Sequence, residues 1–165
     1  MKEKTLLIVD DEISLLSSLK LIMENEVDRI LTAISAPQAF EIIEKNRVDV
    51  IVTDITMPVI NGVEMLKTLR QKGHRMPVIF FSGYGSHEFM SEALELGAYE
   101  FLEKPRVTHL PEVVSRALKN PEQTAFKISS KNPDFERLIQ KKREAKGFSF
   151  KDSSDAGISS ADDRD

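Results

Sequence analysis

Five polar side chains follow the short runs that predict strands: Asp10, Asp11, Asp54, Ser82 and Lys104. The runs are short and mostly apolar, which is typical of strands buried on both faces of a parallel sheet. The carboxyl ends of parallel strands meet at one edge of an open α/β sheet, where ligands bind. We therefore expect these five side chains to converge.

The chemistry of such a cluster follows from its charges. Three carboxylates in one place repel, so their pKa values are driven apart unless a cation is bound. Oxygen ligands without histidine or cysteine suit a hard ion, and Mg²⁺ fits best because it takes few carboxylates. Asp54 is then expected to be a carboxylate nucleophile for phosphoryl transfer, with the ion and Lys104 stabilising the negative charge.

Each residue has a simpler interpretation when it is taken alone. Asp10 and Asp11 could end a strand and begin a helix, where acidic side chains suit the helix dipole. An aspartate after a strand is more often a turn residue than a nucleophile. Ser82 could be an ordinary serine, and Lys104 a solvated lysine. The joint pattern favours the site, because four strand ends carry the residue types that one reaction needs.

Strands and helices alternate over about the first 120 residues. Strands are expected at residues 5–9, 29–34, 50–53, 77–82 and 99–102. Helical spacing follows each of them, in a first helix at 13–24, a second capped by Ser35, a third ended by Gly73, a fourth closed by Gly97 and a last one at about 108–119. This alternation predicts a doubly wound parallel α/β sheet.

Composition limits the class of protein. The 165 residues suit one domain plus an appendage, and 41% hydrophobic with 30% charged residues indicates a soluble globular chain. The absence of cysteine excludes disulfides and thiolate metal sites. With no apolar stretch long enough for a membrane span or signal peptide, a cytoplasmic protein is expected. The net charge of −4 argues weakly against nucleic-acid binding.

The segment after Pro121 has a different character. Residues 133–146 could form one amphipathic helix, and the Ser/Asp-rich end from Lys151 is expected to be disordered. Residues 121–165 hold nine basic and nine acidic side chains, so no net charge drives nucleic-acid binding there. We predict a domain at 1–120 and a tail at 121–165.

The motifs together resemble the receiver domain of two-component response regulators. The resemblance covers about residues 4–119 and rests on four motifs: Asp10-Asp11, Asp54-Ile-Thr-Met-Pro-x-x-x-Gly62, Ser82-Gly83 and Lys104-Pro105. It implies a flavodoxin-like sheet in the order 2-1-3-4-5 with five helices, and a cis peptide bond before Pro105.

The resemblance also implies which residues accept the phosphoryl group and hold the metal. Asp54 would be the phospho-acceptor in this phosphoprotein. Mg²⁺ would be held by Asp10, Asp11, Asp54 and the backbone carbonyl of Thr56.

Further roles are implied around the acceptor. Ser82 would bond the phosphoryl group and Lys104 would pair with it. Ser82 and Phe101 would form the switch. Thr56 and Tyr84 occupy positions that influence how long the acyl phosphate survives, and our hypothesis is that Tyr84 hinders water.

The expected function is a signalling receiver that catalyses only its own phosphorylation and dephosphorylation. The donor would be a histidine kinase or a histidine phosphotransfer protein. A single-domain regulator would act as a monomer or weak dimer, through a protein partner on the face formed by helix 4, strand 5 and helix 5, or as a phosphorelay intermediate. Nucleic-acid and membrane partners are not expected.

Two other functions are less well supported by the residues. A phosphohydrolase with an aspartate nucleophile typically needs a second acid two residues later, where this chain has Thr56. A flavodoxin-like cofactor-binding module needs a phosphate loop after the first strand, where Asp10-Asp11-Glu12 would repel a phosphate.

Overall fold

Eleven elements alternate along the part of the chain that the computed structural model describes, which is residues 2–83 and 89–122. They are, in chain order, β1 (Thr5–Val9), α1 (Ile13–Met23), β2 (Arg29–Ala33), α2 (Ala36–Lys45), β3 (Val50–Thr53), α3 (Gly62–Gln71), β4 (Val78–Ser82), α4 (Met90–Glu95), β5 (Glu100–Glu103), the 3₁₀ helix η2 (Lys104–His109) and α5 (Leu110–Lys119). The five strands form one sheet in the order β2-β1-β3-β4-β5, and every neighbouring pair is parallel. The predicted strand order is confirmed.

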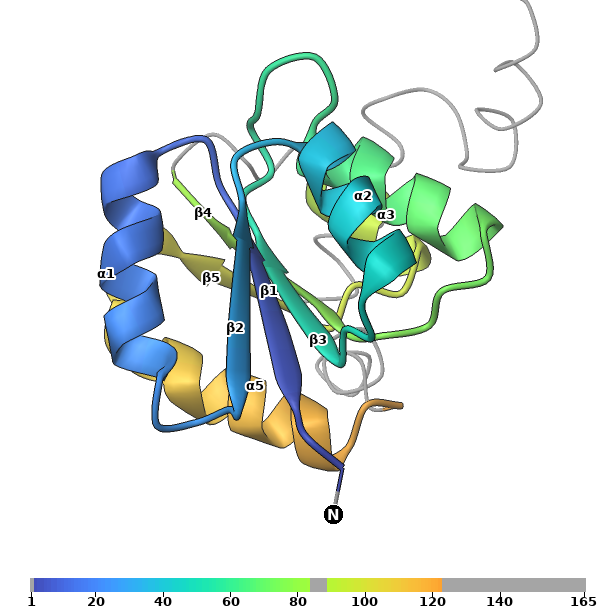
Figure 1. The fold of residues 1–165 in the computed structure, drawn as a ribbon. Helices are drawn as coiled ribbons and strands as arrows, with labels where there is room; N and C mark the ends of the chain where they lie inside the picture. Colours follow the sequence, from blue (N-terminus) through green and yellow to red (C-terminus); the bar gives the residue numbers. More distant parts are fainter. Residues whose placement is uncertain (1, 84–88, 123–165) are drawn as a thin grey trace, which may run out of the picture. The chain divides into compact units, whose positions relative to one another are not determined.

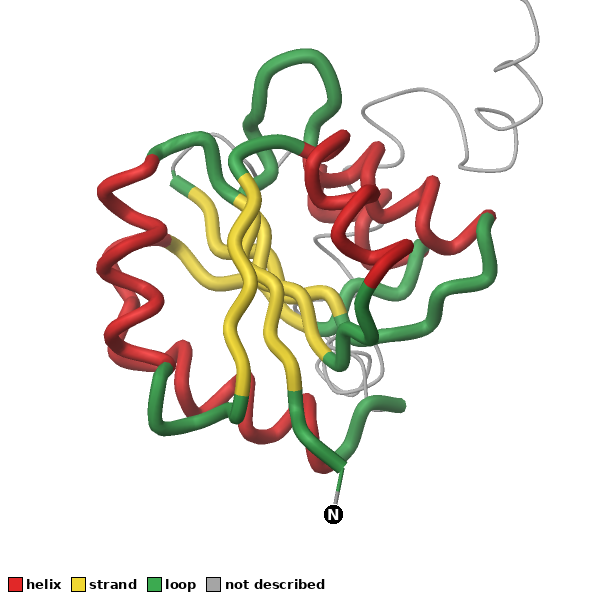
Figure 2. The backbone as a smooth tube through the Cα atoms, viewed as in Figure 1, coloured by secondary structure: helices red, strands yellow, loops and turns green. Residues whose placement is uncertain are grey.

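The sheet lies between two layers of helices, as Figures 1 and 2 show. Alternate side chains of β1 point to opposite faces: Leu7 and Val9 pack with residues of α2 and α3, whereas Leu6 and Ile8 pack with residues of α1 and α5. Every residue of β1, β3 and β4 is buried. Because both faces are covered, these central strands are almost entirely apolar rather than alternating.

Local sequence signals set several helix ends. Ser35 caps the N-terminus of α2, and Asn61 with Glu64 forms a capping box at the start of α3. Gly73 and Gly97 follow α3 and α4 with φ angles of 89° and 85°. A left-handed residue after a helix strongly favours glycine, so the predicted ends of these two helices are confirmed.

Several boundaries differ from the expectation by one or two residues. The first helix ends at Met23, the fourth strand begins at Val78, and the fifth strand is Glu100–Glu103. The second strand ends at Ala33, one residue early, because the Ser35 cap begins α2. Residues 104–109 form a 3₁₀ helix, so α5 begins at Leu110 rather than near 108. Pro111 lies in the first turn of α5, where a missing N–H is tolerated.

Some expectations fall outside what the structure describes. The chain divides into two units, Met1–Ile128 and Ser129–Asp165, and all described residues lie in the first. The helix expected at 133–146 and the disordered end lie outside the described residues, so the boundary near residue 120 stays a prediction. No cis peptide bond occurs among the fully described residues. Pro105 is not one of the fully described residues, so the cis bond before it also stays a prediction.

No helix within residues 2–83 and 89–122 has the length and apolar character needed to cross a bilayer.

Val59 holds an unusual backbone conformation in the loop between β3 and α3. Its φ is 70°, its side chain is 94% exposed, and the Ile60 N–H donates to the Pro58 carbonyl across it at 2.8 Å. Such a tight turn is strained for a β-branched residue.

We expect Val59→Asn to raise the free energy of unfolding by about 1 kcal/mol in urea titrations, because asparagine tolerates this region. Val59→Ala should gain much less, and an equal gain would contradict the strain.

Candidate functional site

The expected residues meet at the carboxyl edge of the sheet. β1 and β3 are neighbours with Val9 opposite Thr53, so the next residues, Asp10 and Asp54, lie side by side. The Asp54 N–H donates to the Val9 carbonyl at 3.0 Å, which extends this pairing into the site. Ser82 ends β4, the strand on the other side of β3.

The Asp54 carboxylate is held by donors on both oxygens. Oδ1 accepts a hydrogen bond from Ser82 Oγ at 2.5 Å and from the Thr56 N–H at 3.2 Å. Oδ2 accepts from Lys104 Nζ at 2.9 Å. The side chain is almost wholly buried, with 6% of the residue exposed. The orientation of this carboxylate is therefore fixed, and its negative charge is met by a charged donor.

Lys104 joins several carboxylates. Its Nζ lies 2.9 Å from Asp54 Oδ2, 3.2 Å from Asp10 Oδ2 and 3.9 Å from Glu12 Oε1. Burial acts to lower the pKa of Lys104, but the hydrogen bond to Asp54 and the negative charges of Asp54 and Asp10 outweigh it and raise the pKa. These contacts therefore favour the charged form of Lys104. Glu12 was not predicted as a site residue, although it directly follows the acidic pair.

The environment of Asp10 suits a second cation. Burial raises the pKa of Asp10 and the Asp54 charge raises it further, against the opposing effects of Lys104 and of the Glu12 N–H, which donates to Asp10 Oδ1 at 2.9 Å. Asp11 is exposed and completes a group whose ligand oxygens, one each from Asp10, Asp11 and Asp54, lie within 4.8 Å of one another. One lysine does not balance three carboxylates. This all-oxygen donor set could hold a hard divalent ion.

The expected switch residue packs against the core. Phe101 in β5 is partly buried, and its ring stacks on the buried ring of Phe80 in β4 with centroids 5.2 Å apart. Ser82 lies in β4, two residues after Phe80. The Ser82 hydroxyl and the Phe101 ring therefore come from neighbouring strands, β4 and β5. Thr56 is exposed beside Asp54. Tyr84 lies outside the described residues.

The fold and this edge together define a class of protein. A parallel α/β sheet in the order 2-1-3-4-5, with an acidic group and a lysine at its carboxyl edge, is the architecture of a two-component signalling receiver. Residues 6–115 match the response regulator receiver domain family, and the chain belongs to that family.

The relatives and solved structures agree with this assignment. The transcriptional regulatory protein FixJ of Azorhizobium caulinodans is 36% identical over 98 residues, which are 59% of this chain and 46% of FixJ. CpxR of Escherichia coli is 38% identical over 100 residues, 61% of this chain and 42% of CpxR. A receiver domain protein from Methanospirillum hungatei is 30% identical with a TM-score of 0.68, covering 73% of this chain and 98% of that one.

The match is to one part of the longer relatives. The chain spans about half the length of the curated relatives it matches, with shares of 60%, 46% and 42% for the first three. The protein has the signalling domain that in this family receives phosphoryl groups from kinases. Several relatives are named as transcriptional regulators. The expectation that nucleic acid is not a partner is therefore not confirmed and stays a prediction.

Proposed function

We propose that Asp54 accepts a phosphoryl group from a histidine kinase or a histidine phosphotransfer protein, and that the phosphorylated domain changes its contacts with other proteins. The observation that supports this most is the pairing of Asp54. Its two oxygens are bonded by Ser82 and Lys104, the two donors that a phosphoryl group on Asp54 would need. One Asp54 oxygen lies within 4.8 Å of a carboxylate oxygen of Asp10 and of one of Asp11.

In the proposed reaction, an Asp54 carboxylate oxygen attacks phosphorus and forms a new P–O bond. The P–N bond to the donor histidine breaks, and the departing imidazole takes the electron pair and a proton from solvent. Ser82 and Lys104 then transfer their hydrogen bonds from the carboxylate to phosphoryl oxygens. Both donors already lie within 2.9 Å of the carboxylate, so short side-chain movements suffice.

Asp10, Asp11, Asp54 and the backbone carbonyl of Thr56 would hold Mg²⁺ in this proposal. The bound ion would neutralise charge that develops on the phosphoryl oxygens. The Asp10 and Asp54 side chains are buried, which keeps them oriented for that role. Thr56 and Tyr84 would modulate the lifetime of the acyl phosphate.

The proposed output surface is the face of α4, β5 and α5. Inward movement of Ser82 toward the phosphoryl group would open space for Phe101, the switch residue of β5. β5 is tied to α5, because Arg116 forms an ion pair with Glu100 and lies over the Tyr99 ring at 5.8 Å from its centroid. A shift of β5 would therefore be transmitted to α5 and change a surface that binds a protein partner.

The proposed acceptor can be tested with acetyl phosphate as the donor. Wild-type protein with Mg²⁺ is expected to gain the mass of one phosphoryl group by intact-protein mass spectrometry, and Asp54→Asn is expected to gain none. The amide is a poor nucleophile, so phosphorylation should be abolished rather than reduced.

Asp28→Asn is the matched control, since Asp28 is an exposed aspartate whose Oδ2 accepts from the Lys4 N–H at 2.7 Å. This variant should be phosphorylated like wild type. A phosphoryl group on the Asp54→Asn protein would disprove the assignment.

A further inference from the structure

A pocket that contains two arginines lies at the opposite edge of the sheet from Asp54. It has a volume of about 380 Å³ and is lined by Arg70, Arg75, Pro77, Gly97, Tyr99, Pro121 and Glu122. Pro77 and Tyr99 come just before β4 and β5, so the pocket is at the amino ends of these parallel strands. It shares no residue with the acidic site.

Arg70 anchors the loops around this pocket. Its guanidinium donates to four backbone carbonyls, those of Leu96, Gly97, His74 and Met76, at 3.0–3.3 Å. A guanidinium has five N–H donors, so one N–H on Nη2 remains without a bond to a described residue. The group is half-buried and is held rigidly between the end of α3 and the end of α4.

Arg75 places a second positive charge beside the first. Its Nη1 donates to the Arg70 carbonyl at 3.3 Å, and this is its one bond within the described ranges. Burial lowers the pKa of Arg70, and the charge of Arg75 lowers it further. Arg75 is exposed and Arg70 is half-buried, and neither guanidinium forms an ion pair with a carboxylate of the described residues. The pocket therefore combines two like charges with unused donors.

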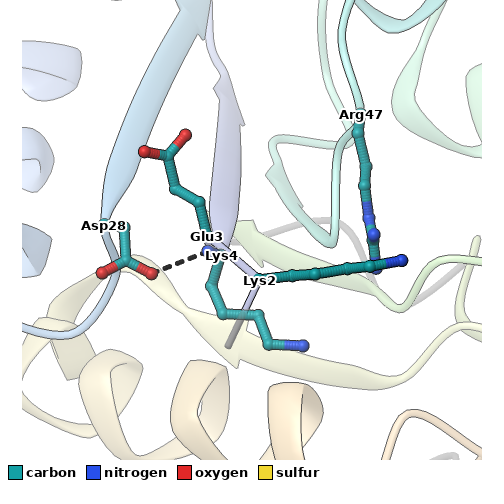
Figure 3. A pocket seen from close by; sticks show the side chains of 5 residues that line it. All are labelled: Lys2, Glu3, Lys4, Asp28 and Arg47. Carbon is teal, nitrogen blue, oxygen red and sulfur yellow. Dashed lines mark hydrogen bonds between the residues drawn. The ribbon is translucent and has the colours of Figure 1, made fainter.

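Another pocket provides a contrast (Figure 3). It has a volume of about 670 Å³ and is lined by Lys2, Glu3, Lys4, Asp28 and Arg47. Its arginine is already paired, since Arg47 Nε donates to Asp49 Oδ1 at 3.1 Å, and two acidic residues are part of its wall. Arg47 thus has a carboxylate partner, whereas neither Arg70 nor Arg75 forms an ion pair within the described residues.

We propose that the pocket at Arg70 and Arg75 binds a small organic phosphate. The phosphate would accept from the unused Arg75 donors and the remaining Arg70 N–H, because guanidinium groups suit phosphate oxygens. Pro77, Tyr99 and Pro121 offer an apolar wall for the organic part. Glu122 also lines the pocket, so its carboxylate would weaken the binding of an anion.

The probes are inorganic phosphate and phenyl phosphate, added to the full chain in EDTA and followed by ¹H–¹⁵N NMR. Saturable chemical-shift changes are expected for the Arg75 and Gly97 amides and for the Arg70 Nε–H. Phenyl phosphate should bind more tightly than inorganic phosphate. Arg75→Gln should weaken binding at least about tenfold, because a charge-assisted contact is lost. Glu122→Gln should strengthen it.

Arg47→Gln is the matched control and should bind like wild type, because it removes an exposed arginine from the other pocket. Three results would overturn the site. Phosphate binding could be weakened equally in Arg47→Gln, or chloride at the same ionic strength could cause equal chemical-shift changes. The changes could also be confined to residues at the Asp54 edge of the sheet. Weaker binding of phenyl phosphate than of inorganic phosphate would overturn the organic ligand. None of these readouts depends on phosphorylation of Asp54.

Discussion

Gly62→Ala is expected to lower the free energy of unfolding by about 3 kcal/mol and to reduce phosphorylation of Asp54 severely. A Cβ at residue 62 would lie 2.2 Å from the Asp54 backbone oxygen and 3.0 Å from both Ile55 Cα and Phe80 Cε1. Two of these neighbours are backbone atoms, which cannot turn aside. The Gly62 N–H also donates to the Ile55 carbonyl at 2.7 Å, so a shift of residue 62 would displace the loop that carries Asp54.

Urea unfolding and acetyl phosphate labelling would measure these two effects. Gly83→Ala is the control, because a Cβ there meets no atom within 4 Å and Gly83 follows the site serine directly. That variant should keep its stability within about 0.5 kcal/mol. A loss below about 1 kcal/mol in Gly62→Ala would show that the close approach is not a constraint.

Lys104→Met is expected to lower both the stability of the protein and the phosphorylation of Asp54, and the loss of stability should depend on Mg²⁺. Without the ammonium, the buried carboxylates of Asp10 and Asp54 lose their common partner at 3.2 and 2.9 Å. We expect a loss of about 2 kcal/mol of stability in EDTA, less than for a fully buried pair because the Lys104 side chain is 26% exposed. Phosphorylation should fall to background, since the phosphoryl group loses its counter-charge.

Saturating Mg²⁺ should recover most of the lost stability, because a divalent ion that binds the folded state replaces the missing charge. Thermal unfolding with and without Mg²⁺ measures this recovery. The matched control is Lys72→Met, which removes an exposed lysine that lies 3.9 Å from Glu44 Oε1 and over the Phe40 ring. It should cost at most about 1 kcal/mol and show no dependence on Mg²⁺. An unchanged deficit of Lys104→Met in Mg²⁺ would argue against a metal at the acidic group.

Some features of this site could not be predicted from the sequence. The β3–α3 motif identified Gly62, but the reason for glycine is the approach of the Asp54 oxygen in the folded chain. The ion pair of Glu12 with Lys104 joins residues far apart in the chain. The strained turn at Val59 and the Arg70 contacts have no local sequence signal, because both depend on where loops meet in space.

Local patterns in the sequence predict the sheet, its helices and the edge where chemistry is possible. Apolar runs and glycine or cap residues act locally, so strands, helix ends and the residues that follow each strand could be predicted from spacing. The tertiary structure decided which of those residues touch. It brought Ser82 and Lys104 onto separate oxygens of Asp54, because parallel pairing of β1, β3, β4 and β5 aligns their carboxyl ends.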